Sequence, residues 1–353
     1  MEKVRLEGVT KLFGSVTVVS DVNMQVQNGE FRVIVGPSGS GKTTLLRLIA
    51  GLEKLSKGHI YINGKLVDDI PPKDRNIAMV FQNYALYPHL SVEQNIGLPL
   101  KVRKMPPHEI DRAVKDISEL LHISHLLKKK PGQTSGGEQQ RVALARALVR
   151  SPEVFLLDEP LSNLDAKLRV EARGLLKRLQ KELDITTVFV THDQSEALSL
   201  ASVVSVMNGG RIIESGDPQR IYSFPQHLFT ATFIGSPPMN VIEGTITEEG
   251  GKKFFSCESL KLRIANIYNV RSGQKVKLGI RPEDVRLEGD LQAKVTVFEP
   301  MGSTALVTLN LGGHEFVVQT TSGINFDAGD MVSVGFPSHA LHLFNEEGTR
   351  LPF

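Results

Sequence analysis

The chain has 353 residues, of which 41% are hydrophobic and 23% charged, a composition typical of a globular protein long enough for two domains. Its net charge of +2 argues against a dedicated nucleic-acid surface, and its single cysteine, Cys257, favours a reducing compartment. The charged N-terminus lacks a signal core, and no apolar run approaches the roughly 20 residues that span a bilayer. Any membrane role would therefore come through a partner.

The first part of the chain predicts strands and then a phosphate-binding turn. Residues 1–30 alternate apolar and polar positions around an Asn28-Gly29 turn, which is typical of antiparallel strands. Phe31–Val35 predicts a buried strand, and Lys42–Gly51 predicts a helix that stops at glycine. The order is strand, glycine-rich turn and helix.

Helix and strand signals then alternate. Residues 84–150 are rich in helix signals, including apolar residues at helical spacing over 110–121. Apolar runs at Val154–Leu157 and Thr187–Val190 predict strands, with a helix at about Leu168–Leu183 between them. This alternation predicts a mainly parallel α/β core.

The composition changes near Gly235-Ser236-Pro237-Pro238. Beyond this point glycine turns separate short alternating strands such as Lys275–Leu278, Ala293–Val297 and Ala305–Leu309. That pattern predicts a small all-β barrel. We place the domain boundary near residue 235, with an α/β domain at 1–235 and a β-barrel domain at 236–353.

A phosphate loop is predicted at Gly36–Thr43, which matches G-x-x-x-x-G-K-[ST] between a strand and a helix. Its glycines let backbone N–H groups turn toward phosphate oxygens at the helix start. Lys42 would neutralise the β- and γ-phosphates, and the Thr43 hydroxyl would bind Mg²⁺. The predicted nucleotide contacts from this loop are Gly36, Ser38, Gly39, Ser40, Gly41, Lys42, Thr43 and Thr44.

Four polar side chains follow predicted strands, where ligands of parallel sheets bind. Asp158 is placed to hold Mg²⁺, and Glu159 could orient or deprotonate an attacking water. His192 could contact the γ-phosphate, and the Gln82 amide could ligate Mg²⁺ or water. Taken singly, each has a structural alternative, such as a capping carboxylate or a packed histidine.

Ser135-Gly136-Gly137 at a helix start offers a hydroxyl and free N–H groups, a second anion site. A simple helix N-cap is the structural alternative. His122 and His125 could share a helix face, but too few further ligands surround them for a metal site. We therefore interpret both histidines as solvated or packing residues.

In this order and spacing, the phosphate loop, Gln82, Ser135-Gly136-Gly137, Asp158-Glu159, Ser162–Asp165 and His192 resemble the ATP-binding cassette (ABC) ATPases throughout residues 1–235. The resemblance implies an α/β P-loop NTPase fold, with a RecA-like core and antiparallel β and helical subdomains, the helical one at about 84–150. It implies ATP and Mg²⁺ as cofactors. It also implies a head-to-tail homodimer that closes on ATP.

In such a dimer each ATP lies between the phosphate loop of one subunit and the Ser-Gly-Gly helix of the other. The resemblance therefore implies that Ser135 and Gly137 complete the site of the opposite subunit. It implies that Phe13 stacks on adenine and that the loop ending at Asp165 crosses the dimer interface.

Three further segments, Met79–His89, Phe233–Asn240 and Gly279–Asp284, look like the ATPase subunits of maltose- and glycerol-phosphate-type importers. Those proteins carry a C-terminal OB-like (TOBE) β-barrel with regulatory and dimer-stabilising roles, so the resemblance covers essentially the whole chain. It implies ATP hydrolysis coupled to uptake of a sugar or oligosaccharide through two integral-membrane permease subunits, served by an extracytoplasmic solute-binding protein. The chain would then be cytoplasmic and peripheral on the inner face of the cell membrane.

The permease would dock near Tyr84–Tyr87. In the resembling family this segment receives a short cytoplasmic helix of the membrane subunit, and Tyr84, Leu86 and Tyr87 would then be exposed anchors. The alternative is that these aromatic side chains pack internally between lobes.

Three alternative functions stay open. One is an importer of polyamines, sulfate, iron or phosphonates with the same architecture. A second is a soluble ABC ATPase of DNA repair or translation, although the chain lacks long coiled-coil insertions and tandem cassettes. The third is an unrelated P-loop kinase or GTPase, which the Ser-Gly-Gly element and His192 argue against.

Two residues depart from the family's Leu-Ser-Gly-Gly-Gln pattern, because Thr134 replaces leucine and Glu138 replaces glutamine. A carboxylate pointing at a triphosphate would repel it. We expect Glu138 to face away from the triphosphate, or to reach ribose and water, so that activity survives.

Overall fold

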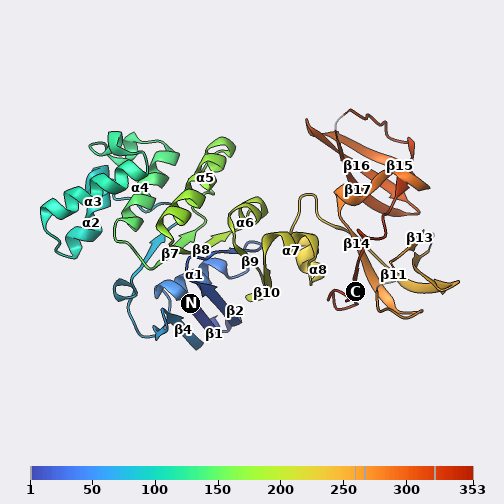
Figure 1. Ribbon diagram of the computed structural model, residues 1–353, viewed down its shortest axis with the longest axis horizontal. Helices are drawn as coiled ribbons and strands as arrows, with labels where there is room; N and C mark the ends of the chain where they lie inside the picture. Colours follow the sequence, from blue (N-terminus) through green and yellow to red (C-terminus); the bar gives the residue numbers. More distant parts are fainter. Residues whose placement is uncertain (1, 259, 266–267, 322, 353) are drawn as a thin grey trace. The chain divides into compact units, whose positions relative to one another are not determined.

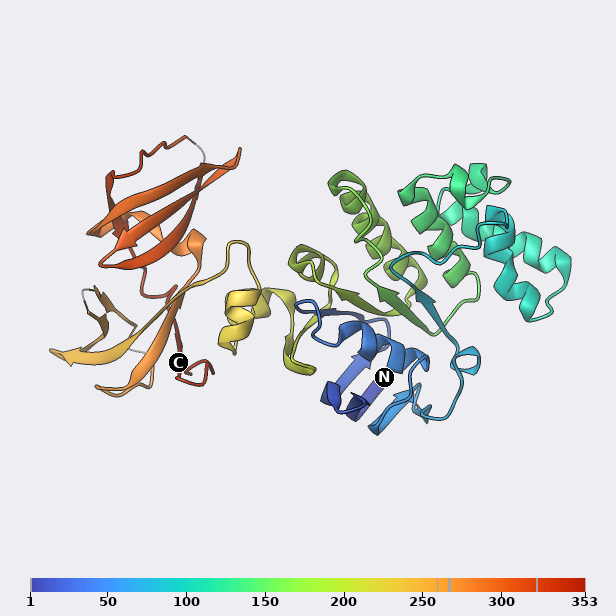
Figure 2. The same ribbon diagram turned by 180° about the vertical axis from the view of Figure 1, so that it is seen from behind.

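The computed structural model describes residues 2–258, 260–265, 268–321 and 323–352, and the chain divides into two compact units, 1–218 and 219–353. Within these described ranges no helix is both long and apolar enough to cross a membrane. Figures 1 and 2 show the chain from opposite sides, and each unit is described by itself below.

An antiparallel sheet opens unit 1, as the alternation over residues 1–30 predicts. Its four strands lie in the order β2-β1-β4-β5. They are β1 (Glu2–Phe13), β2 (Val16–Gln27), β4 (Lys57–Ile62) and β5 (Lys65–Leu66). Val4 and Leu6 on β1 are fully buried while their neighbours are partly exposed, so one face of the sheet carries the apolar side chains.

The central sheet of unit 1 has six strands in the order β10-β9-β3-β8-β7-β6 (Figure 1). They are β3 (Phe31–Val35), β6 (Ile77–Val80), β7 (Val154–Asp158), β8 (Thr186–Thr191), β9 (Val203–Asn208) and β10 (Arg211–Gly216). Strands β9, β3, β8, β7 and β6 are parallel, and β10 is antiparallel to β9. Every residue of β3, β7 and β8 is buried, in line with their mainly apolar sequences, FRVIV, VFLLD and TTVFVT.

Helix α1 (Lys42–Ala50) joins the two sheets into one core. Its Leu45 and Ile49 belong to a cluster that contains Val4 of the antiparallel sheet and Val188 of the central sheet. Gly51 ends the helix in the left-handed conformation, as the sequence predicts. Two more helices, α5 (Ala166–Leu183) and α6 (Gln194–Leu200), connect the later strands.

The segment expected to be rich in helix contains α2 (Val92–Val102), α3 (Pro107–Leu120) and α4 (Gly136–Leu148), which group together in Figure 1. The expectation that His122 and His125 share a helix face was wrong. Helix α3 ends at Leu120, His122 has a φ of +57°, and His125 lies in a separate 3-10 turn at Ser124–Leu126. Both histidine side chains are exposed.

Unit 2 begins with two short helices, α7 (Pro218–Ser223) and α8 (Leu228–Phe233), and continues as two antiparallel sheets. The first, in the order β13-β12-β11-β14-β19, contains β11 (Asn240–Glu249), β12 (Lys252–Cys257), β13 (Leu260–Arg263), β14 (Lys275–Ile280) and β19 (His342–Phe344). The second, in the order β17-β16-β15-β18, contains β15 (Arg286–Pro300), β16 (Thr304–Leu311), β17 (His314–Thr321) and β18 (Met331–Gly335).

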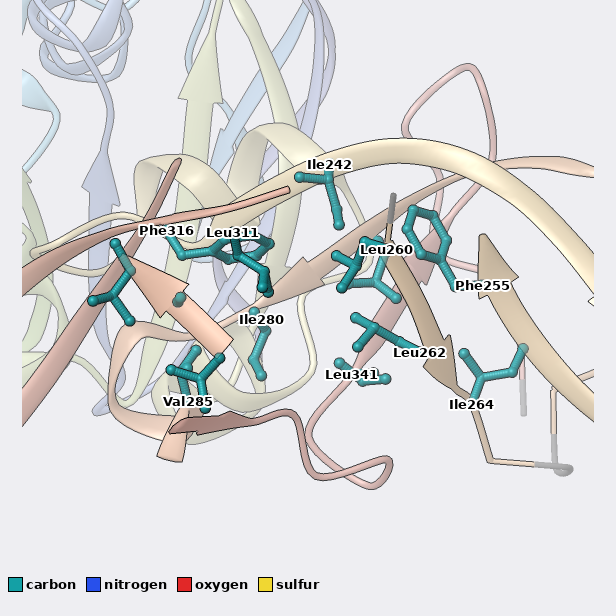
Figure 3. Packing of buried hydrophobic residues seen from close by; sticks show 14 of the residues in the cluster. Ile242, Phe255, Leu260, Leu262, Ile264, Ile280, Val285, Leu311, Phe316 and Leu341 are labelled. Atoms are coloured by element: carbon teal, nitrogen blue, oxygen red, sulfur yellow. The ribbon is translucent and has the colours of Figure 1, made fainter. Parts of the chain in front are cut away.

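One hydrophobic core holds the two sheets of unit 2 together. Figure 3 shows its members from the first sheet, such as Phe255 and Ile280, and from the second, such as Phe316. Cys257 is partly buried at the end of β12, and burial raises the pKa of its thiol. That environment disfavours the thiolate and supports the interpretation of Cys257 as an unreactive strand residue.

The compact units divide between Pro218 and Gln219, earlier than the boundary expected near residue 235. The physical reason is that α8 packs on unit 2, where Ala231 shares a cluster with Met239 and Phe344. The composition change at residue 235 marks the start of the β-strands, whereas the packing unit already includes the helices before it.

Candidate functional site

The parallel strands of the central sheet end side by side at one edge. Strands β3 and β8 finish together at the pair Val35–Thr191, and β7 finishes at Asp158, which pairs with Val190. Strand β6 finishes at Val80, next to the end of β7. The phosphate loop and the polar residues that follow β6, β7 and β8 therefore emerge at the same edge, as the sequence predicts.

The phosphate loop, Gly36–Thr43, depends on glycine at two crowded positions. A Cβ atom on Gly36 would lie 2.1 Å from the carbonyl oxygen of Met207. Gly41 has a φ of +99°, and a Cβ there would lie 2.5 Å from the carbonyl oxygen of Val18. Neighbouring backbone thus holds the loop against the sheet, and no side chain fits at either point.

Lys42, the loop lysine, is 5% exposed and donates hydrogen bonds to the carbonyl oxygens of Gly36 and Pro37 at 2.8 and 2.9 Å. Burial lowers the pKa of its ammonium, while the carboxylates of Glu159 and Asp158 act in the opposite direction. A buried ammonium held by two neutral carbonyls gains from an anionic partner. This environment favours exchange of the carbonyls for phosphate oxygens.

The remaining loop residues differ in exposure. Ser38 and Gly39 are exposed at the tip, whereas Ser40 is buried and its hydroxyl has no hydrogen-bond partner. Thr43 and Thr44, at the start of α1, are half-buried. The tip and the first turn of α1 are therefore the parts of the loop that a ligand can reach.

A pair of oxygens suited to a hard cation lies beside the loop. The Thr43 hydroxyl donates to Oδ1 of Asp158 at 2.8 Å. Asp158 is 5% exposed, and burial raises the pKa of its carboxyl group. A divalent cation would supply the positive charge that this buried carboxylate needs, and hydroxyl and carboxylate oxygens are ligands that Mg²⁺ accepts. Among the described residues no group of three His, Cys, Asp or Glu side chains could hold a metal ion.

Glu159 and His192 form a pair at the ends of β7 and β8. Nδ1 of His192 lies 2.9 Å from Oε2 of Glu159, and the side chains are 55% and 18% exposed, respectively. The Glu159 backbone has a φ of +45° and donates its N–H to the carbonyl oxygen of Val190. This turn aims the carboxylate at the histidine, so one side chain holds the other in place.

Gln82 lies two residues beyond β6, and its side chain is exposed. Its carbonyl oxygen accepts a hydrogen bond at 2.9 Å from Nδ2 of Asn163, in the segment after β7. The main chain at Gln82 is therefore tied to the loop that carries Ser162–Asp165. Its amide is left for a ligand or water.

Ser135 caps α4, and Glu138 closes the cap from inside the helix. The Ser135 hydroxyl accepts the Glu138 N–H at 3.4 Å, and a Glu138 carboxylate oxygen accepts the Ser135 N–H at 2.7 Å. This backbone hydrogen bond lowers the pKa of the Glu138 carboxyl group. The carboxylate of Glu138 thus returns to the serine that begins the helix, and whether it faces away from a triphosphate or reaches ribose and water stays a prediction. Both Ser135 and Gly136 are exposed.

The chain matches known protein families in both of its parts. Three family models match the chain, described as "ABC transporter" at residues 19–162, "MalK OB fold domain" at 235–285 and "TOBE domain" at 278–344. The trehalose/maltose import ATP-binding protein MalK of Thermococcus litoralis is 48% identical over 98% of each chain. The chain belongs to the ABC transporter ATPases.

Two further comparisons support this assignment. The sn-glycerol-3-phosphate import ATP-binding protein UgpC 1 of Rhizobium johnstonii is 42% identical over 99% of this chain and 96% of its own. The ATP-binding cassette MJ0796, solved as a dimer bound to ADP and Pi, shares 33% identity with a TM-score of 0.55, covering 61% of this chain and 98% of that one.

The ABC assignment confirms the predicted fold class, an ABC ATPase domain followed by an OB-fold/TOBE β domain. ABC import ATPases of this kind bind ATP and work as dimers with permease subunits.

Two other residues predicted to contact ATP or the second subunit, Phe13 and Asp165, lie at the end of a strand and at the start of a helix. Phe13 ends β1, where its ring is 46% exposed and the Lys11 ammonium lies 4.5 Å from the ring centre. Asp165 caps α5 and accepts the Leu168 N–H at 2.9 Å. Phe13 therefore has an open ring face, and Asp165 holds its loop to the start of a helix.

The predicted docking segment is only partly exposed. Tyr84 is 5% exposed, and burial raises the pKa of its hydroxyl, so the expectation that it forms an exposed anchor was wrong. Its backbone has a φ of +61°, in the left-handed region. Tyr87 is 44% exposed, and the guanidinium of Arg146 lies 5.7 Å from its ring centre. Arg146 also donates to the carbonyl oxygens of Tyr84 and Ala85, both at 2.8 Å, and so fixes this loop.

A groove of about 840 Å³ lies next to this segment and includes Phe81, Tyr87 and Val102 in its lining. Arg103 and Arg150 also line the groove, and the charge of Arg103 contributes to lowering the pKa of Arg150, whose largest cause is burial. The groove therefore combines apolar side chains with an excess of basic ones, since Lys73, Arg103, Arg146 and Arg150 line it beside one acidic residue, Asp74.

Sequence reasoning missed Arg169, which lines a small cavity behind Glu159 and His192. No motif marks an arginine in the first turn of a helix, since such residues are common on solvated faces. Its position four residues after Asp165, the residue that caps α5, was the one available signal.

Proposed function

We propose that the chain hydrolyses ATP at two composite sites of a head-to-tail homodimer and thereby drives import of a sugar, an oligosaccharide or glycerol phosphate. The observation that carries this proposal is the arrangement of Lys42, Asp158, Glu159 and His192 at one edge of the central sheet. The named substrates of the MalK and UgpC relatives, trehalose/maltose and sn-glycerol-3-phosphate, support the solute class.

The phosphate loop binds the triphosphate of ATP in this proposal. Backbone N–H groups of the loop and of the first turn of α1 face the phosphates, and Lys42 moves its hydrogen bonds from two carbonyls to phosphate oxygens. Thr43, Asp158 and the Gln82 amide would hold Mg²⁺. Bound there, the ion would supply positive charge to the phosphate oxygens on which negative charge develops.

Glu159 orients the attacking water and accepts its proton as the water oxygen bonds to the γ-phosphorus and the bond to the β,γ-bridging oxygen breaks. His192 holds the Glu159 carboxylate through its Nδ1 and offers its other ring nitrogen to the γ-phosphate. The pair thus couples the position of the base to the presence of the phosphate.

The second subunit completes each site. Its Ser135 hydroxyl and Gly137 N–H contact the γ-phosphate, and its loop at Asp165 crosses the interface. Phe13 stacks on adenine with its exposed ring face. Closure of the dimer therefore requires ATP, because without the triphosphate the two halves share no common ligand.

The groove beside Tyr87 receives a cytoplasmic helix of a permease subunit, which holds the ATPase on the inner face of the cell membrane. The positive charge of Arg103 and Arg150 favours a helix with acidic residues. Tyr87 provides an exposed aromatic anchor at the rim.

Glu159→Gln tests the proposed chemistry. Glutamine keeps the shape of the side chain but cannot accept the proton, so we expect ATP turnover to fall by about 10²–10⁴-fold. ATP binding should persist, measured with a fluorescent ATP analogue. Static light scattering of this variant should show a larger share of dimer with ATP than without it.

Near-normal turnover of Glu159→Gln would refute Glu159 as the base. A share of dimer that does not rise at saturating ATP would contradict ATP-driven closure. Lys42→Ala serves as the control for binding, since loss of the loop ammonium should abolish both ATP binding and the ATP-dependent dimer.

A further inference from the structure

A small cavity of about 40 Å³ lies behind the Glu159–His192 pair. It is lined by Glu159, Ser162, Arg169, Thr191, His192, Asp193 and Glu196. These residues come from three different segments, namely the loop after β7, helix α5 and the turn from β8 into α6. The cavity marks the place where those segments meet.

Arg169 projects from the first turn of α5 and contacts the other two segments. Its Nη2 donates to the carbonyl oxygen of Leu164 at 3.1 Å. Its Nη1 lies 3.6 Å from Oδ2 of Asp193, and its Nε lies 4.0 Å from Oε1 of Glu196. The Nε atom is buried and has no hydrogen-bond partner. On this side the guanidinium is therefore held mainly by its attraction to the two carboxylates.

The two carboxylates that face Arg169 are close to His192 in the chain. Asp193 follows His192 directly, and Glu196 binds Thr191, the residue before it. The Thr191 hydroxyl donates to Oε2 of Glu196 at 2.5 Å and accepts the N–H of Asp193 at 2.9 Å. Asp193 also caps α6, since its Oδ1 accepts the N–H groups of Ser195 and Glu196. His192 therefore lies between Thr191 and Asp193, whose positions depend on these hydrogen bonds and on the contacts with Arg169.

Glu196 is 3% exposed, and burial raises the pKa of its carboxyl group. The Thr191 hydrogen bond and the charge of Arg169 act in the opposite direction and favour the ionised form. A buried carboxylate needs such a partner, because an unpaired buried charge is strongly destabilising. Movement of Arg169 would therefore disturb Glu196 and, through Thr191, the backbone that carries His192.

We propose that Arg169 is a positioning residue that couples the interface loop at Leu164 to the placement of His192. The inference rests on the proposed function, in which the loop ending at Asp165 contacts the second subunit. When that subunit engages the loop, the carbonyl of Leu164 and the guanidinium of Arg169 shift together, and Asp193 and Glu196 follow. Hydrolysis is thereby linked to closure of the dimer and not to ATP binding alone.

An arginine is needed for this role because its rigid fork reaches three groups at once. Lysine keeps the charge near Asp193 and Glu196 but offers one nitrogen, so it cannot hold the Leu164 carbonyl at the same time. Arg169→Lys therefore keeps the positive charge but loses the contact with the Leu164 carbonyl, and Arg169→Ala removes both.

Arg173 provides a matched control on the same face of α5. It lies one turn further along and donates to the Ser195 hydroxyl at 3.0 Å, so it also joins α5 to the start of α6. No hydrogen bond or ion pair links it to Leu164 in the described structure. Arg173→Ala removes a comparable bridge between the helices but leaves the path to the interface loop intact.

The experiment measures kcat and KM for ATP with the full-length chain, together with thermal unfolding. We expect Arg169→Ala to lower kcat by about 10–100-fold, as a small misplacement of a reacting group does, with KM and the unfolding temperature close to those of the parent. Arg169→Lys should also lower kcat, and Arg173→Ala should stay within about twofold of the parent. In a Glu159→Gln background, Arg169→Lys should still form the ATP-dependent dimer.

Three results would overturn the inference. They are a kcat within twofold of the parent for Arg169→Ala, an equal loss of kcat in Arg173→Ala, or a loss of activity in Arg169→Lys that follows a matching loss of thermal stability. Failure of the proposed function itself is separate, because it would appear as absent turnover in the parent or as no ATP-dependent dimer in Glu159→Gln alone.

Discussion

Glu138 departs from the Leu-Ser-Gly-Gly-Gln pattern that the resemblance implies, and its carboxylate accepts the Ser135 N–H at 2.7 Å. Glutamate and glutamine can both close this type of capping box, so the two residues differ in charge more than in structure. A negative charge at a helix N-terminus stabilises the helix but opposes an incoming phosphate. The exchange therefore affects folding and catalysis in opposite directions.

Folding measurements can isolate the cap. Glu138→Ala loses the hydrogen bond to Ser135, and we expect the free energy of unfolding to fall by about 1 kcal/mol in urea titrations at pH 7. Glu138→Gln should retain most of it. Because the folded-state pKa of Glu138 is lowered, its contribution is present above the unfolded pKa and is lost as pH falls through the folded value. Equal losses for Ala and Gln at pH 7 would contradict the role of the cap.

Turnover measurements can isolate the charge. We expect ATP turnover of Glu138→Gln in the assembled transporter to rise by less than tenfold, because the carboxylate is already engaged with the Ser135 N–H. A gain of tenfold or more, about 1.4 kcal/mol of barrier, would show that the native carboxylate is a real handicap to hydrolysis.

At the scale of elements, the phosphate loop is held by backbone that passes close behind it. Gly36 and Gly41 face carbonyl oxygens of β9 and β2 at distances that no Cβ atom tolerates. The loop can therefore keep its shape without ligand, so less conformational entropy is lost when a triphosphate binds.

Substitution of the loop glycines should show this support. Gly41→Ala combines a φ of +99° with a Cβ atom 2.5 Å from the Val18 carbonyl oxygen, and we expect it to destabilise unit 1 by about 3 kcal/mol or more. Gly39→Ala is the matched control, because it has a φ of +77° but nothing within 4 Å of the added Cβ. It should cost about 1 kcal/mol.

Thermal unfolding of both loop variants without nucleotide is the measurement. A difference of several degrees in the unfolding temperature of unit 1, with Gly41→Ala lower, is the expected result. If the two variants unfold at the same temperature, steric contact behind the loop is not what fixes its conformation.

The sequence predicted the strand ends well because buried parallel strands are short apolar runs, and polar residues after them must lie at the sheet edge. Asp158, Glu159 and His192 were placed at the sheet edge in this way, whereas Lys42 came from the phosphate-loop motif. The inward turn of Tyr84 and the contacts of Arg169 could not be predicted, because both depend on tertiary packing. The local sequence around a tyrosine or an arginine is the same whether its side chain is buried or exposed.

At the scale of the whole chain, unit 2 owes part of its stability to the helices that precede its sheets. Arg281 is 2% exposed and donates to the carbonyl oxygens of Ala231 and Ile234 at the end of α8 and to that of Tyr222 in α7. The helices therefore supply hydrogen-bond acceptors to a buried guanidinium as well as adding apolar contacts.

Two fragments test this arrangement. A fragment of residues 219–353 should fold cooperatively, as judged by circular dichroism on heating. A fragment of residues 236–353 should be less stable by about 3 kcal/mol or more, because Arg281 loses its carbonyl partners and Met239 loses the contact with Ala231. Equal stability of the two fragments would place the domain boundary at residue 235 after all.

The position of β3 in the central sheet has a consequence for synthesis of the chain. β3 is translated early, at Phe31–Val35, yet its two neighbours are β8 at Thr186–Thr191 and β9 at Val203–Asn208. At about 5–20 residues per second, roughly 10–30 s pass before either neighbour leaves the ribosome. Throughout that interval the apolar strand that precedes the phosphate loop lacks both sheet partners. We therefore expect β3 to need shielding by chaperones until β8 and β9 have been synthesised.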